Sequence, residues 1–153
     1  MSQLYFLEAE DVIEIHDDIL ANEPGLHGTH HGKVEGVIGR VKSIYSYSDD
    51  IDNAFDLAAH YGVAIARGHG FNDANKRTAF VTMVTVLEVN KFPIPEELKE
   101  QIVSNAGSWA DIMVMVAEGK LEAKELSNAI SIVYFIGAFG VGIAKLVSLF
   151  TKD

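Results

Sequence analysis

The segment HGFNDANKR at positions 69–77 concentrates the side chains of this chain that could do chemistry. A neutral imidazole such as that of His69 is a general base for a hydroxyl nucleophile near neutral pH. Asp73 offers a carboxylate of the kind that holds Mg²⁺ together with phosphate oxygens. Lys76 and Arg77 supply two positive charges. A base, a metal ligand and charge-neutralising groups are the parts that phosphoryl or nucleotidyl transfer requires.

The position of this segment in the chain predicts an anion site. The segment is typical of a loop that enters a helix, and we expect Asp73 to be the N-cap of that helix and Phe71 to anchor the loop in the core. The first N–H groups of a helix have no intrahelical acceptor, and the helix dipole adds about half a positive charge there. Because cations in a first turn oppose the dipole, the surplus of positive charge predicts an anionic ligand.

Apolar residues at helical spacing predict the elements that must position this segment. We expect helices near 8–21 and 33–47, and a third that begins around the aspartates at 49–52 and runs to about 67. The stretch 75–90 is apolar on all sides and predicts a buried central helix. Its valines and threonines also allow a strand, which its length disfavours.

The second half of the chain continues the helical pattern. Pro95 opens a further predicted helix, and Ser108 with Asp111 resembles a capping box for a helix that ends at Gly119. We expect Trp109 in or near the core. The fold class predicted from these patterns is an all-α bundle with a central buried helix after the loop.

Several histidines lie outside the segment at 69–77. His27, His30 and His31 occupy a glycine-rich loop over 22–32 and could bind zinc or nickel. The alternatives are a flexible polar loop, which the missing acidic and cysteine ligands favour, or a loop near the site that touches a target. His16 falls at an inward-facing position of the first helix, and we expect it to pack against or bond to a neighbour.

Composition restricts the class of protein. The chain has 153 residues, 48% of them hydrophobic, which fits one globular domain or one domain with an appendage. It has no cysteine, so disulfides, thiolate metal sites and cysteine nucleophiles are excluded. The N-terminal residues do not resemble a secretory signal, and a cytoplasmic location is expected.

The net charge bears on partners. It is −10, and residues 1–50 carry ten acidic side chains against three basic ones. A surface this acidic disfavours direct binding of nucleic acid, because it repels the phosphate backbone. The excess acid indicates either a cationic protein partner or simply a device for solubility.

The C-terminal stretch Ile130–Phe150 is apolar, with Lys145 as its one charged residue. It is long enough to cross a bilayer as a helix, and its glycines would permit close helix contacts. The alternative is a soluble helix that packs on the domain or on a second copy. We therefore expect a main domain over 1–128 and an apolar helical extension over 129–153.

The segment at 69–77 resembles the signature of the Fic/Doc superfamily, H-x-F-x-D/E-x-N-x-R, at every fixed position. Further stretches resemble the Doc (death-on-curing) branch: Ala66-Arg67-Gly68, Thr78-Ala79, Ile38-Gly39-Arg40-Val41 and Ala117-Glu118-Gly119-Lys120-Leu121. The resemblance covers roughly residues 8–130, and the apolar tail departs from it.

This resemblance implies an all-α toxin of a toxin–antitoxin module, with ATP as substrate, Mg²⁺ as cofactor and a Phd-like antitoxin whose C-terminal segment blocks the active site. Many superfamily members transfer AMP to a hydroxyl group, and these usually carry glycine before the final arginine of the signature. Here that slot holds Lys76, as in the Doc branch, which phosphorylates a threonine of elongation factor Tu and arrests translation. A bulky cation in that slot would force ATP to bind in the opposite sense, with its γ-phosphate toward the nucleophile.

The resemblance also implies a role for each residue. His69 is the general base and Asp73 the Mg²⁺ ligand, Asn72 and Asn75 bind phosphate oxygens with the nearby amides, and Arg77 and the lysine before it neutralise developing charge. Three alternatives remain open from the sequence. They are an AMP-transferase of the same fold, a non-catalytic module that tunes an antitoxin's repression of a shared operon, and a membrane-tethered enzyme.

Overall fold

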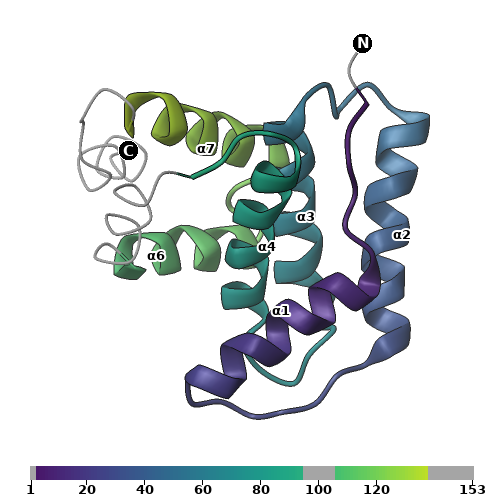
Figure 1. Ribbon diagram of the computed structural model, residues 1–153, viewed down its shortest axis with the longest axis vertical. Coiled ribbons are helices and arrows are strands. Elements are labelled where there is room, and N and C mark those ends of the chain that lie inside the picture. Colours follow the sequence, from purple (N-terminus) through teal and green to yellow (C-terminus); the bar gives the residue numbers. More distant parts are fainter. Residues whose placement is uncertain (1–2, 95–105, 138–153) are drawn as a thin grey trace.

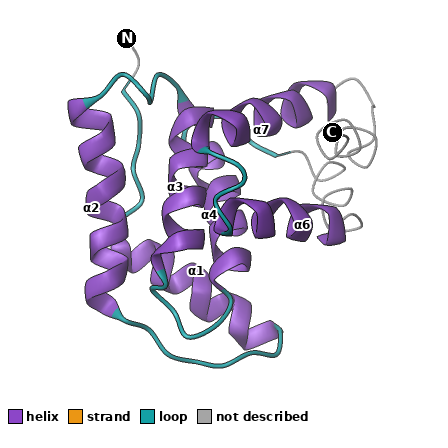
Figure 2. Ribbon diagram, turned by 180° about the vertical axis from the view of Figure 1, so that it is seen from behind, coloured by secondary structure: helices purple, strands orange, loops and turns teal. Residues whose placement is uncertain are grey.

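The computed structural model describes residues 3–94 and 106–137, which form six helices (Figure 1). In chain order these are α1 (Ala9–Asn22), α2 (His31–Tyr47), α3 (Ala54–Gly68), α4 (Asn75–Val89), α6 (Ala106–Ala117) and α7 (Ala123–Gly137). Within these two ranges there is no strand, apart from an isolated bridge between Thr29 and Phe71 (Figure 2). The predicted all-α fold is confirmed.

Helices α3 and α4 pack side by side at the centre of the molecule (Figure 1). The inner face of α3, with Phe55, Ala58 and Ala59, is buried. A Cβ atom added to Gly62 would overlap the side chain of Met83 on α4. Because small residues line this face of α3, the two helices approach closely and fix the positions of the ends that meet at the loop 69–74.

The other helices cover this central pair from two sides. Helices α1 and α2 lie on one side, while α6 and α7 project from the other (Figures 1 and 2). On α1, the residues Val12, His16 and Leu20 are buried at successive turns, so the apolar stripe predicted for this helix faces the core. Helix α1 packs against α4, which brings its buried face beneath the start of α4.

Residues 75–89 are helical, so the strand considered for this stretch is wrong. Helix α4 buries Thr78, Met83 and Leu87, among others, but its Val81 and Val89 side chains are exposed. The helix is therefore central, as predicted, yet one of its faces reaches solvent.

Two helix starts differ from the prediction. Helix α3 begins after Asn53, whose side chain accepts a hydrogen bond from the N–H of Asp56 at 2.9 Å, rather than at the preceding aspartates. Helix α6 begins at Ala106, so Ser108 lies inside it and the predicted capping box is wrong. Burial of an apolar face that includes Trp109 and Met113 stabilises this helix without that cap.

Of the remaining predictions for this part of the chain, the end of α6 is confirmed, whereas the helix after Pro95 stays a prediction. Helix α6 ends at Ala117, and Gly119 follows with φ +80°, which confirms the predicted stop. Trp109 is buried in the core, as expected. The helix predicted after Pro95 lies outside the described residues.

Helix α7 contains the first part of the predicted apolar tail. The predicted boundary between residues 128 and 129 falls inside this helix, which buries Leu126, Ile130 and Val133. Among the helices in the described ranges, none is long and apolar enough to cross a bilayer. The rest of the predicted tail, residues 138–153, lies outside those ranges.

Candidate functional site

The loop 69–74 joins α3 to α4 and carries the first half of the signature. His69 ends α3 in the left-handed conformation, with φ 52° and ψ 38°. Its side chain is exposed and makes no hydrogen bond or ion pair with any residue that the structure describes. An imidazole held at a sharp turn with both ring nitrogens free is well placed to take a proton from an incoming hydroxyl group.

Arg67 fixes the turn of α3 that precedes His69. Its Nε donates to the carbonyl oxygen of Val116 at 2.8 Å, and Nη2 donates to that of Leu121 at 2.9 Å. The guanidinium also forms an ion pair with Glu122 at 3.1 Å. These contacts join the end of α3 to the turn between α6 and α7, a supporting role that sequence reasoning did not assign.

The carboxylate of Asp73 is held by two backbone N–H groups. Oδ1 accepts from Ala74 at 2.8 Å, and Oδ2 accepts from Leu26 at 3.0 Å. These two bonds are the main cause that lowers the pKa of Asp73 from its ordinary value, and the nearby Arg77 and Lys76 charges lower it further. The carboxylate is therefore ionised at neutral pH.

Asp73 is not the N-cap of α4. Ala74 occupies that position, in the left-handed conformation with φ 66°, and α4 begins at Asn75. The prediction is wrong because it places the turn one residue too early. Instead of capping the first turn of α4, the carboxylate turns back to the N–H of Ala74 and across to a second loop.

The donor set at Asp73 is compatible with Mg²⁺ bound together with phosphate. Each carboxylate oxygen keeps a lone pair beyond the hydrogen bond that it accepts, and the side chain is partly exposed. Among the described residues, no group of three histidine or acidic side chains could hold a metal ion by itself. A single carboxylate suits Mg²⁺, which usually takes one or two carboxylates and fills its remaining positions with water and phosphate oxygens.

Lys76 and Arg77 lie in the first turn of α4. The Lys76 side chain is exposed and, among the described residues, has no hydrogen bond or ion pair. Arg77 donates from Nη1 to the carbonyl oxygen of Pro24 at 3.3 Å, and it lies 3.9 Å from carboxylate oxygens of both Asp73 and Glu23. The cations and the unpaired N–H groups of the first turn form the predicted positive helix end.

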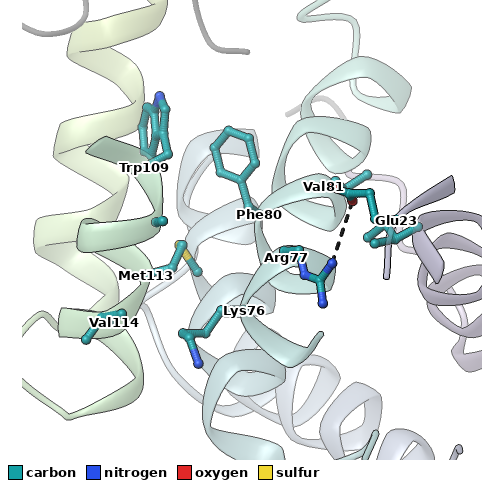
Figure 3. A pocket seen from close by; sticks show the side chains of 10 residues that line it. Glu23, Lys76, Arg77, Phe80, Val81, Trp109, Met113 and Val114 are labelled. Carbon is teal, nitrogen blue, oxygen red and sulfur yellow. Dashed lines mark ion pairs between the residues drawn. The ribbon is translucent and has the colours of Figure 1, made fainter. Parts of the chain in front are cut away.

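These cations open onto an apolar groove of about 350 Å³ between the end of α1, α4 and α6 (Figure 3). Phe80 and Val81 of α4 line it on one side, and Trp109 and Met113 of α6 on the other. In Figure 3, Arg77 points toward Glu23, to which it is paired. A positive end beside an apolar groove suits a ligand with both an anionic and an apolar part.

Asn75 holds the loop in shape. Its Oδ1 accepts from the N–H of Phe71 at 3.1 Å, and its Nδ2 donates to the carbonyl oxygen of Phe71 at 2.9 Å. Phe71 is buried, so it anchors the loop in the core as expected. Because both polar atoms of the Asn75 side chain are already bonded, its contribution to phosphate binding remains a prediction, and the observed contacts assign it to loop geometry.

The loop over 23–30 pairs with the loop 69–74 along their backbones. The N–H of Asn72 donates to the carbonyl oxygen of Gly28 at 3.0 Å, and the N–H of His30 donates to that of Gly70 at 2.8 Å. These two bonds flank the isolated bridge between Thr29 and Phe71. The loop therefore lies beside the site, as one of the sequence-based alternatives proposed.

The Asn72 side chain belongs to the same pairing. Its Oδ1 accepts from Nε2 of His30 at 2.9 Å, and its Nδ2 donates to the carbonyl oxygen of His27 at 3.2 Å. Phosphate binding by Asn72 stays a prediction. His30 therefore bonds to Asn72, and no metal-ligand cluster with His27 and His31 is found among the described residues.

Two comparisons relate the sequence of this chain to known proteins. A model of the Fic/DOC family matches residues 6–87, which include the paired loops and nearly the whole of α1 to α4. The chain is also similar to the protein "Protein kinase doc" of Escherichia phage P1, with 33% identity over 129 residues. That match covers 84% of this chain and 94% of the phage protein.

Proposed function

Because this chain belongs to the Fic/DOC family and is of the Doc type, we propose that it is a toxin that transfers a phosphoryl group from ATP to a protein hydroxyl. The proposed target is a translation factor similar to elongation factor Tu, whose modification would arrest protein synthesis. The observation that carries the proposal is the arrangement of the loop 69–74. It places a free imidazole and an ionised carboxylate beside the cationic start of α4.

The reaction can be written from the residues of this chain. The target hydroxyl oxygen attacks the γ-phosphorus, the bond between that phosphorus and the β,γ-bridging oxygen breaks, and ADP leaves. His69 takes the hydroxyl proton, since its ring is exposed and unbonded to described residues. Lys76 and Arg77 stabilise the charge on the phosphate oxygens together with the free N–H groups of α4. Asp73 would hold Mg²⁺, which, when bound, neutralises phosphate charge.

The choice of phosphoryl over AMP transfer depends on Lys76. Its side chain is exposed and, among the described residues, makes no hydrogen bond or ion pair, so at the first turn of α4 it is available to bind a phosphate. A glycine there would leave room for the α-phosphate. The lysine favours the opposite orientation of ATP, with the γ-phosphate near His69.

Labelled ATP tests this proposal. The purified chain is incubated with Mg²⁺ and an elongation factor Tu-like protein, with ATP labelled on either the γ- or the α-phosphate. The γ label is expected to stay on the target, and the α label is expected to be released. Transfer of the α label would instead identify an AMP-transferase. The control is His69→Asn, which removes the base and suits the left-handed backbone at this position.

The same preparation tests the remaining parts of the proposal. Expression of the wild-type chain is expected to arrest growth, and His69→Asn is expected to relieve the arrest. Co-expression with a small Phd-like antitoxin should restore growth and yield a stable complex. If neither label is transferred and the complex still forms, the chain is a non-catalytic binding module and the proposed activity is wrong.

A further inference from the structure

A second histidine lies under the site. His16 of α1 has no exposed surface and contacts the loop 69–74 from its buried side. Its ring stacks on that of Phe71, with ring centroids 3.9 Å apart and planes inclined by 7°. Its Nε2 lies 3.0 Å from the carbonyl oxygen of Asp73. Sequence reasoning expected His16 to pack against or bond to a neighbour, which is confirmed, but did not identify the neighbours.

The hydrogen bond between His16 and Asp73 has a defined direction. A carbonyl oxygen only accepts, so Nε2 of His16 donates. The other ring nitrogen, Nδ1, lies 3.1 Å from Oδ1 of Asp17, a carboxylate on the exposed side of α1. The stacked Phe71 ring fixes the plane of the imidazole, and the hydrogen bond to the Asp73 carbonyl oxygen fixes its rotation in that plane.

The peptide unit that joins Asp73 to Ala74 is held at both ends. Its carbonyl oxygen accepts from His16, and its N–H donates to Oδ1 of the Asp73 carboxylate at 2.8 Å. A peptide unit is planar, so its two groups turn together. If the carbonyl rotated away from His16, the N–H would rotate away from Oδ1 of the carboxylate, which would then be held only through Oδ2 by the N–H of Leu26.

The same peptide unit precedes a residue in the left-handed conformation. Ala74 has φ 66°, a backbone state that costs a non-glycine residue free energy and persists only when its surroundings impose it. The bond from His16 is a buried contact of this kind. It therefore acts on the two features that define the site, the direction of the Asp73 carboxylate and the start of α4.

We propose that His16 is a positioning residue for the transfer reaction: through the carbonyl oxygen of Asp73 it orients the Asp73–Ala74 peptide, so that the carboxylate faces the phosphate site. This inference rests on the proposed function for its effect on turnover. Its effect on the loop does not depend on any activity, because His16 contacts the loop when neither nucleotide nor target protein is bound. His16 does not touch the reacting groups.

Three substitutions separate the hydrogen bond from the packing. His16→Phe keeps a ring for stacking on Phe71 but removes the donor. His16→Gln loses the ring but places an amide N–H near the position of Nε2. His16→Met has nearly the length of the glutamine side chain and no donor. A matched control is Tyr61→Phe, which removes two buried hydrogen bonds to the Leu7 backbone away from this loop.

Two readouts are measured on the full chain. The first is amide hydrogen exchange of residues 70–75 without nucleotide, resolved by NMR. The second is turnover with γ-labelled ATP, with kcat and the KM for the target protein determined separately. For His16→Phe and His16→Met we expect exchange of the Ala74 amide to rise about tenfold or more and kcat to fall by about the same factor, with KM little changed. His16→Gln should restore both quantities to within about threefold of wild type.

The results for these variants can overturn the positioning role of His16 in three ways. Wild-type exchange and kcat in His16→Phe would overturn the inference, as would a His16→Gln variant no better than His16→Met. The third outcome is that kcat and the protection of the Ala74 amide fall only in proportion to the folded fraction, as expected for Tyr61→Phe. His16 would then have a structural role alone, and the inference would be wrong. Should His16→Phe not fold, the Gln and Met pair still isolates the donor. If wild type transfers neither label, the proposed function fails, and the exchange rates by themselves test whether His16 holds the peptide.

Discussion

Replacement of Asn75 by alanine measures how strongly the loop 69–74 is held. The change removes two hydrogen bonds to Phe71, of 3.1 and 2.9 Å. Each such bond contributes about 0.5–1.5 kcal/mol net, and the higher helix propensity of alanine offsets about 0.5 kcal/mol. We therefore expect the free energy of unfolding to fall by about 0.5–2.5 kcal/mol, and the melting temperature of a chain this long to fall by about 1–10 °C.

Thermal unfolding followed by circular dichroism gives the stability change, and hydrogen exchange at the Phe71 amide locates it. The matched control is Asn53→Ala, which removes the N-cap bond to the N–H of Asp56. Loss of such a cap costs about 1 kcal/mol, close to the effect expected at Asn75. The control should be destabilised to a similar degree, yet keep wild-type exchange at Phe71 and wild-type phosphoryl transfer.

The Asn75 result can refute the reasoning in two ways. A variant that melts within about 1 °C of wild type, with an equally protected Phe71 amide, would mean that these bonds contribute nothing. A variant with a protected Phe71 amide but no transfer would mean that Asn75 acts on phosphate directly. The role in loop geometry would then be wrong and the role in phosphate binding correct.

Three further predictions concern the paired loops and their ionised groups. His69→Asn should melt within about 1 °C of wild type in a calorimeter, because the side chain is exposed, while transfer is lost; retained transfer would exclude His69 as the base. Gly28→Ala should lower the melting temperature by several degrees, since φ is +139° and the added Cβ would overlap the Asn72 side chain, whereas Gly32→Ala, which has open space, should melt at or slightly above the wild-type temperature. Two backbone hydrogen bonds lower the pKa of Asp73, so their stabilisation is fully present above its ordinary value of 3.8 and disappears only as pH falls through the lowered value. The difference in melting temperature between wild type and Asp73→Asn should therefore be constant from pH 7 to about 5 and shrink at more acidic pH, and a difference that already shrinks above pH 5 would contradict this assignment.

The helices could be predicted from the spacing of apolar residues, and the chemistry of the signature segment from its side-chain types. Val12 and His16 lie at helical spacing, and their burial on α1 is what that spacing predicts. At positions 69, 73, 76 and 77, the side-chain groups themselves indicate the chemistry, since an imidazole, a carboxylate and two cations have few common uses together. Local pattern failed where tertiary packing decides, as at Ser108, which lies within α6, a helix that buries an apolar face including Trp109 and Met113.

What the sequence determined by itself is the all-α fold, the order of its helices and the presence of a base, a carboxylate and two cations within nine residues. These follow from periodicity and from side-chain type, which depend on near neighbours only. The tertiary structure alone decided that Ala74 rather than Asp73 occupies the N-cap position of α4, that the loop over 23–30 pairs with the loop 69–74, and that His16 bonds to the carbonyl oxygen of Asp73. The physical reason is that the two pairings join residues forty or more positions apart, and their partners are chosen by the packing of α1 against α4.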